Sequence, residues 1–216
     1  MEDDNTIMQN FVKKFKSVNT NNPYIINQKI NKNGLKNDLK MAIWFTDGSC
    51  TGNGKKSANG GYAAVCVNGH QKGLLLFGKV NTDIKATNIR AECYAILTVL
   101  ENMLQDTDLT WNHGIIYSDS EFWIKMVYDY MPKWKAANFD LKANPDLTKK
   151  LWKIWQQLHK TDKMVEIVHV FAHNKDKSAT STDPFKRFCH DNNQLADELA
   201  DIARNLPSGD MKKLYI

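Results

Sequence analysis

The chain has 216 residues, of which 42% are hydrophobic and 25% charged, values typical of a soluble globular protein with one domain and at most a short extension. This length excludes a large multi-domain assembly, and no apolar run approaches the roughly 20 residues of a membrane-spanning helix. The net charge of +5 permits nucleic-acid binding without requiring it.

Residues 1–40 are rich in asparagine and lysine, and they hold seven lysines against four acidic residues, or +3 of the total charge. The asparagines interrupt any apolar periodicity, so the sequence predicts a flexible arm. This arm is either a passive tail or a segment that contacts nucleic-acid phosphates, and the sequence favours neither role decisively. The acidic, polar start lacks a secretory pattern, so we expect an intracellular protein, whether in the cytoplasm, the nucleus or a viral replication compartment.

The four cysteines are widely spaced and form no Cys-x-x-Cys pair, which argues against a zinc ribbon or a disulfide scaffold. From residue 41, β-rich runs predict strands at 41–47, 61–67 and 73–80. The last two are joined by Asn68-Gly69, a typical hairpin turn. Thr87 or Asn88 can cap a helix that continues to about residue 104.

The second half of the domain predicts a strand at 114–118, helical stretches near 120–131 and 146–160, a strand at 164–171 and a last helix at about 192–205. The order is therefore βββαβααβα, an α/β domain with a five-stranded mixed sheet over residues 41–206. Residues 207–216 are expected to be a short C-terminal tail.

Four acidic residues fall at informative places in this order. Asp47 and Asp119 end predicted strands, whereas Glu92 and Asp197 lie on predicted helices. Each alone is more often a turn, cap or surface residue. Pairing of the two strands would, however, bring Asp47 and Asp119 to one sheet edge, where their charges repel.

A cluster of carboxylates is tolerable when divalent cations compensate its charge. Oxygen ligands without cysteine or convergent histidine favour Mg²⁺ or Mn²⁺ over Zn²⁺. Two such ions roughly 4 Å apart can activate a water and stabilise the leaving oxygen at a phosphodiester. The pattern therefore indicates phosphoryl transfer, with two Mg²⁺ ions, Mn²⁺ as a substitute and no small-molecule cofactor.

The local sequences around these acids resemble type 1 ribonuclease H, in the chain order of that family. The resemblance covers about residues 41–205 and is carried by Thr46-Asp47-Gly48-Ser49-Cys50, Asn88-Ile89-Arg90-Ala91-Glu92, Ser118-Asp119-Ser120 and Ala196-Asp197-Glu198-Leu199-Ala200. It implies a ribonuclease H-like fold with helices on both faces of the sheet. It also implies a metal-dependent endonuclease that cuts the RNA strand of an RNA/DNA hybrid, with these four acids as metal ligands. A monomer is the default expectation, which no motif supports.

The same resemblance assigns further residues to catalysis and binding. His173 matches a mobile histidine that assists product release or proton transfer. Alternatively, His173 only caps a strand or lies in a loop, and His190 is the second candidate for the catalytic role. The loop after Asp47 would contact the RNA strand around its 2′-hydroxyls. The other residues implied to contact substrate are Ser49, Cys50, Asn53, Asn88 and Asn193.

A segment with interleaved aromatic residues and lysines, which we call the handle, resembles the family's substrate-binding protrusion. It contains Trp134, whose alternative role is to pack the handle against the domain. Glu121 departs from many relatives by adding an acid beside the substrate path; alternatively, it is a favourable acid at a helix N-terminus. The stretch 173–193 is also unusually long. The rest of the handle set is Tyr130, Lys133, Lys135, Phe139 and Lys142.

Two other functions remain open at this point. A DNA strand-transfer or resolving nuclease could use a similar scaffold, although the sequence context of the acids argues against it. A catalytically dead hybrid-binding module would be expected to lack a carboxylate, yet all four candidates are present.

Overall fold

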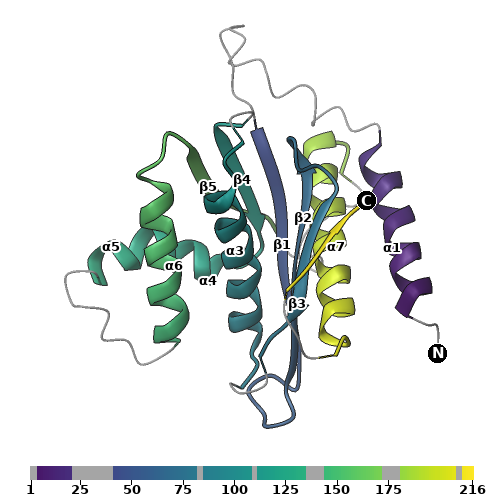
Figure 1. The fold of residues 1–216 in the computed structure, drawn as a ribbon. Coiled ribbons are helices and arrows are strands. Elements are labelled where there is room, and N and C mark those ends of the chain that lie inside the picture. Colours follow the sequence, from purple (N-terminus) through teal and green to yellow (C-terminus); the bar gives the residue numbers. More distant parts are fainter. Residues whose placement is uncertain are drawn as a thin grey trace, which may run out of the picture.

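The computed structural model describes residues 4–20, 41–81, 85–108, 111–134, 144–171, 181–207 and 211–216. A mixed sheet forms the centre of the molecule, and helices cover both of its faces (Figure 1). The strand order is β5-β4-β1-β2-β3-β6. The α/β class is therefore confirmed, but the sheet has six strands and not the predicted five.

Three antiparallel strands lead into the domain, as predicted: β1 (Met41–Thr51), β2 (Asn59–Asn68) and β3 (Leu74–Lys79). The Asn68-Gly69 signal does mark a hairpin, although its connection is longer than two residues. Gly69 and Gly73, at φ values of 97° and 89°, allow this connection to turn. Strand β4 (His113–Ser118) then pairs with β1 in parallel, and β5 (Met164–His169) pairs with β4 in parallel.

Helix α3 (Asn88–Gln105) covers one face of the sheet, and α6 (Pro145–Leu158) packs outside it. The Thr87 hydroxyl accepts a hydrogen bond from the Arg90 N–H at 3.2 Å, so Thr87 and not Asn88 caps α3. Between β4 and α6 the chain forms one continuous helical stretch with a π-helical centre: α4 (Glu121–Lys125), η1 (Met126–Tyr130) and α5 (Met131–Trp134).

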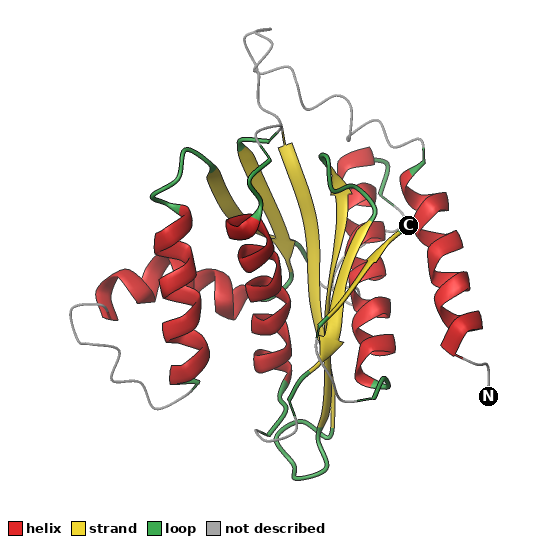
Figure 2. Cartoon of the chain, in the orientation of Figure 1, coloured by secondary structure: helices red, strands yellow, loops and turns green. Residues whose placement is uncertain are grey.

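The opposite face is covered by α7 (Pro184–Arg204), outside which lies α1 (Asp4–Asn19) (Figure 2). Helix α7 starts eight residues earlier than predicted. Asp183 caps it by accepting a hydrogen bond from the Phe185 N–H at 2.9 Å, and Pro184 suits the first helical position. Residues 184–191 and His190 therefore lie in a helix and not in the predicted loop.

The prediction of a flexible arm is wrong for residues 4–19. Phe11 and Phe15, four residues apart, are buried in the apolar cluster on the α7 side of the sheet, and Lys14 pairs with Glu198 of α7. Such burial outweighs the poor helix propensity of the asparagines. Residues 21–40 lie outside the described part of the chain.

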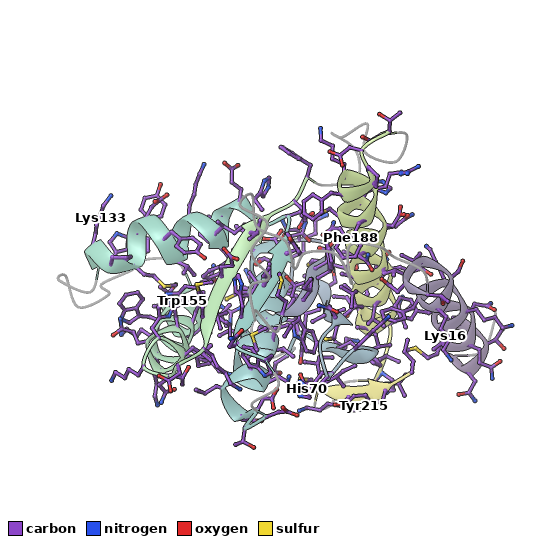
Figure 3. All side chains as sticks on the ribbon, turned by 90° about the horizontal axis from the view of Figure 1, so that it is seen from above. Lys16, His70, Lys133, Trp155, Phe188 and Tyr215 are labelled. Carbon is purple, nitrogen blue, oxygen red and sulfur yellow. The ribbon has the colours of Figure 1, made fainter. Side chains whose placement is uncertain are left out.

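The predicted C-terminal tail is likewise partly a strand. β6 (Lys212–Tyr215) pairs antiparallel with β3 and forms one edge of the sheet. The view from above shows Tyr215 beside this edge and Phe188 of α7 facing the sheet (Figure 3). In the described residues, no helix is long and apolar enough to cross a membrane.

A candidate carboxylate centre at the carboxyl ends of the strands

The four predicted acids come from four different elements. Asp47 lies within β1, which continues to Thr51 and so does not end at Asp47 as predicted. Asp119 directly follows β4, whose last residue, Ser118, is paired with Thr46 of β1. Glu92 is in the second turn of α3, and Asp197 is in the middle of α7.

A glycine on each side of the sheet lets the two helices come close. A Cβ atom at Gly48 would lie only 2.2 Å from the Glu92 nitrogen, and one at Gly61 would lie 2.3 Å from the Ala200 carbonyl oxygen. Both distances are far below a van der Waals contact, so only glycine fits. The backbone of α3 therefore touches β1 beside Asp47, and that of α7 touches β2.

The electrostatics show that the four carboxylates act on one another. Asp47 is 7% exposed, and burial raises its pKa well above the usual range, with further increases from Asp119, Asp197 and Glu92. Burial also raises the pKa of Glu92 to about 7, opposed by a hydrogen bond from Ser120 and assisted by Asp119. Unlike acids of an ordinary surface, Asp47 and Glu92 are therefore desolvated and lie near like charges.

Hydrogen bonds from neighbouring residues orient two of these acids. The Gly48 N–H donates to Asp47 Oδ1 at 2.7 Å, and the Ser120 hydroxyl donates to Glu92 Oε2 at 2.5 Å. Sequence reasoning did not identify Ser120 as a site residue. Its position after Asp119, in Ser-Asp-Ser, was the available signal.

The donor set fits a hard divalent cation in its chemistry, because it consists of carboxylate oxygens whose mutual repulsion a cation would relieve. Within the described ranges, however, no three His, Cys, Asp or Glu side chains are arranged so that they could already hold an ion.

The loop that follows Asp47 is tied to the start of α3. The Asn53 side-chain oxygen accepts a hydrogen bond from the Asn88 N–H at 3.1 Å, and the Gly54 N–H donates to the Ala86 carbonyl at 3.1 Å. The structure therefore brings together Asn53 and Asn88, both exposed, which the sequence predicted as separate substrate contacts. Cys50 is partly exposed at the base of the same loop.

Ser49 points to the α7 side of the sheet and meets two charged residues that sequence reasoning missed. Its hydroxyl donates to Asp201 Oδ1 at 2.5 Å and accepts from Arg204 Nη1 at 2.5 Å. The available signal was the spacing of Asp197, Asp201 and Arg204, which places all three on one helix face.

The two predicted residues in the region after β4 have local partners. Trp134 is partly buried against the α3-side core and stacks on Tyr130, with ring centroids 5.4 Å apart. Glu121 begins α4 and pairs with Lys125 at 2.6 Å, which agrees with a helix N-terminal acid. Exposed Lys133 extends from the same end of the molecule (Figure 3), whereas Lys135, Phe139 and Lys142 lie outside the described residues.

Two further predicted residues differ in how far the structure describes them. Asn193 is fully buried in α7, one turn before Asp197, and its side-chain nitrogen and oxygen have no hydrogen-bond partner among the residues that the structure describes. His173 lies outside the described residues. The rival His190 is in α7, with its Nδ1 atom 3.2 Å from Asp191 Oδ1.

The sequence of this chain is similar to that of a known family and of several known proteins. The family model RNase H matches residues 39–205. A Ribonuclease H from Baumannia cicadellinicola subsp. Homalodisca coagulata is 31% identical over 168 residues, which are 76% of this chain and 90% of the relative. A Ribonuclease H from Schizosaccharomyces pombe is 32% identical over 152 residues, covering 67% of this chain and 51% of the relative.

A solved structure with a similar fold is the protease-reverse transcriptase of prototype foamy virus. It aligns with a TM-score of 0.57 at 21% identity, over 77% of this chain and 21% of that chain. At this identity the likeness concerns the fold alone.

Proposed function

The chain belongs to the ribonuclease H family, and we propose that its carboxylate centre, formed by Asp47, Glu92, Asp119 and Asp197, is where it cuts its substrate. Members of this family are hydrolases that act on the RNA strand of RNA/DNA hybrids and depend on divalent metal ions, and this chain is such an endoribonuclease. The observation that carries the proposed site is the burial of Asp47 close to Asp119, Asp197 and Glu92, because burial and these three charges all raise its pKa.

We propose that the centre holds two Mg²⁺ ions, with Mn²⁺ as a substitute, in a protein that works as a monomer. When bound, such ions supply an activated water and neutralise charge on the phosphodiester. The chain itself holds the carboxylates in place. The Gly48 N–H fixes Asp47, and the Ser120 hydroxyl fixes one oxygen of Glu92.

The binding surface for the hybrid is proposed to begin at the loop tied by Asn53 and Asn88. The Asn88 backbone N–H donates to the Asn53 side-chain oxygen at 3.1 Å and so ties this loop to the start of α3, the helix that carries Glu92. Both residues are exposed, and their side chains are proposed to reach polar groups of a nucleic acid. Ser49 and Cys50 form the base of this loop. The stacked Tyr130 and Trp134, together with exposed Lys133, are proposed to contact the DNA strand.

Two residues have supporting or later roles in this proposal. The amide of Asn193 is buried one turn from Asp197, without a partner in the described part of the chain, and is proposed to bind within the loaded centre. His173 is proposed to transfer a proton or assist product release, as the family resemblance implies. Glu121 is proposed to influence strand preference through its charge.

A hybrid labelled on each strand in turn tests the proposal, with Mg²⁺, Mn²⁺ or EDTA and with duplex DNA and duplex RNA as controls. We expect metal-dependent cutting of the RNA strand of the hybrid only. Asp119→Asn should abolish cutting while the fold is kept. Asp162→Asn, an exposed acid in the turn before β5, is the matched control and should cut normally.

Other results would contradict the proposal in distinct ways. Cutting of duplex DNA would favour a strand-transfer or resolving nuclease. Binding of the hybrid without cutting would indicate a catalytically dead module. Full activity of Asp119→Asn would show that the site is wrong.

A further inference from the structure

Beyond Asp47, β1 carries a second polar group on the same side, which we call the Ser49 corner: Ser49, Asp201 and Arg204. Three contacts of 2.5 Å join the Ser49 hydroxyl, Asp201 Oδ1 and Arg204 Nη1 pairwise. The side chains of Arg204 and Asp201 are 23% and 47% exposed, and Ser49 is buried. The corner is therefore a compact, partly enclosed network at the protein surface.

The backbone fixes the position of this corner. Ser49 is paired with Gly61 of β2, and a Cβ atom at Gly61 would lie 2.3 Å from the Arg204 nitrogen. The last turn of α7 is thus pressed against β2 directly beside Ser49. Because Asp201 and Arg204 are three residues apart, both reach Ser49 from the same helix face.

The chemistry of the three groups fixes the direction of each hydrogen bond. A carboxylate only accepts and a guanidinium only donates, whereas a serine hydroxyl has one hydrogen and two lone pairs. The Ser49 hydrogen must therefore go to Asp201, and one lone pair must receive Arg204. A single lone pair of Ser49 is left, so any ligand that binds Ser49 must supply a hydrogen-bond donor.

This requirement distinguishes the polar groups of a nucleic acid. A ribose 2′-hydroxyl can donate, a phosphate oxygen or a 2′-fluorine can only accept, and a deoxyribose carries neither group. Ser49 lies two residues beyond Asp47 on the same side of β1, about 7 Å along the strand. The Ser49 corner therefore lies next to the carboxylate centre that we propose cuts the RNA strand.

We propose that Asp201 and Arg204 are positioning residues that hold the Ser49 hydroxyl as an acceptor, so that the corner selects a ribose 2′-hydroxyl for its ability to donate. The inference rests on the proposed function, since it concerns the strand that the carboxylate centre cuts. It goes beyond that function by assigning the direction of the hydrogen bond and the two charged residues that impose it.

The test uses RNA/DNA hybrids in which a single ribose near the cut carries 2′-fluorine in place of the hydroxyl, one position at a time. The readout is kcat/KM at one cut site, as the ratio of hydroxyl to fluorine substrate. For the wild-type chain we expect a ratio of about tenfold at one position, the value of one good hydrogen bond. Asp201→Ala frees the Ser49 hydrogen to donate to fluorine, so the ratio should fall below about threefold.

Three further variants separate positioning from a general loss of structure. Asp201→Asn keeps an oxygen that accepts from Ser49 and should retain most of the ratio. Asp191→Ala removes a carboxylate of the same helix with nearly the same exposure, 49% against 47%, and should leave the ratio unchanged. Asp201→Ala leaves the Arg204 guanidinium without its counter-charge, which could destabilise the fold. The double variant Asp201→Ala/Arg204→Ala avoids this problem, and its ratio of hydroxyl to fluorine substrate should also fall below about threefold.

The remaining outcomes are decisive. The inference is overturned if Asp201→Ala or the double variant keeps the wild-type ratio. It is also overturned if the wild-type chain cuts the hydroxyl and fluorine substrates equally well at every position. If Ser49→Ala keeps the full ratio, the hydroxyl is read elsewhere and the inference also fails. A wild-type chain that does not cut the unmodified hybrid contradicts the proposed function instead.

Discussion

The carboxylate centre and the Ser49 corner lie side by side, two residues apart on β1 and one helical turn apart on α7, yet their charges are arranged in opposite ways. In the centre, burial and the charges of the three other acids all raise the pKa of Asp47. In the corner, Asp201 is matched by Arg204 at 2.5 Å. A site that needs a cation from solution and one that is complete within the chain can thus share the same two elements.

The carboxylate centre and the Ser49 corner are therefore suited to different chemical tasks. Uncompensated, buried carboxylates favour a cation and are suited to chemistry at a charged phosphate. A compensated network has no net charge to satisfy and is suited to recognising a neutral group such as a hydroxyl. Substitutions in one site should therefore spare the other, whereas a substitution between β2 and α7 should disturb both.

The largest expected effect is the loss of a carboxylate from the centre. Asp47→Asn should lower kcat on the hybrid by about a thousandfold or more, because a ligand of the catalytic ions is removed. The same variant should be more stable than the wild-type chain in EDTA at pH 8, since a repelling charge has gone. Thermal melts with and without EDTA, beside cleavage rates, test both parts, and a less stable variant would contradict the electrostatic account.

A methyl group at Gly61 should disturb both sites together. Gly61→Ala places a Cβ atom 2.3 Å from the backbone of α7, so the helix must shift away from β2. We expect a loss of about 3 kcal/mol in unfolding free energy and reduced cleavage. Gly60→Ala, at the preceding glycine of β2, adds a Cβ atom whose nearest neighbour lies 3.1 Å away and serves as the control; equal losses in both variants would refute the packing argument.

The pH dependence of stability should reveal the repulsion in the metal-free protein. The pKa of Glu92 is raised from 4.5 to about 7 in the fold, so the folded state favours its protonated form. Stability should fall as pH rises from about 4.5 to 7 and then level off, by about 3 kcal/mol for this group. Urea melts in EDTA should show this decline, and Glu92→Gln should flatten it; a stability that rises over this window would contradict the assignment.

The smallest expected effect belongs to the corner. Ser49→Ala removes one neutral hydrogen bond to substrate and should lower kcat/KM about fivefold to tenfold, while metal dependence stays as in the wild-type chain. Steady-state kinetics over a Mg²⁺ series measures both quantities. A changed Mg²⁺ requirement would show that the two sites are not separate.

The sequence predicted the part of the fold that rests on apolar patterning. The strands around Trp44, Val65 and Ile116 are buried on both faces and show continuous apolar runs, which period and length identify well. The hairpin at Gly69 and the cap at Thr87 follow from local chemistry.

The parts that failed depend on tertiary contacts. Helix α1 forms because Phe11 and Phe15 find a surface on the α7 side, a contact that its asparagine-rich composition conceals. Strand β6 has only four residues and exists through pairing with β3. The early start of α7 was signalled by Asp183 and Pro184, but the surrounding polar sequence favoured a loop.

The grouping of the four acids was predictable because each lies in a recognisable local sequence, although Asp47 lies within β1 and not at its end. The Ser49 corner was not, because Asp201 and Arg204 become partners of Ser49 only when α7 is pressed against β2 at Gly61. Long-range packing of this kind leaves no local pattern.

The most direct test of the central claim is a Mg²⁺ titration of thermal stability at pH 8, comparing the wild-type chain with Asp47→Asn and Asp201→Asn. We expect Mg²⁺ to raise the melting temperature of the wild-type chain and of Asp201→Asn alike, and to raise that of Asp47→Asn far less. A wild-type chain whose melting temperature ignores Mg²⁺, or an equal increase in all three, would contradict this expectation.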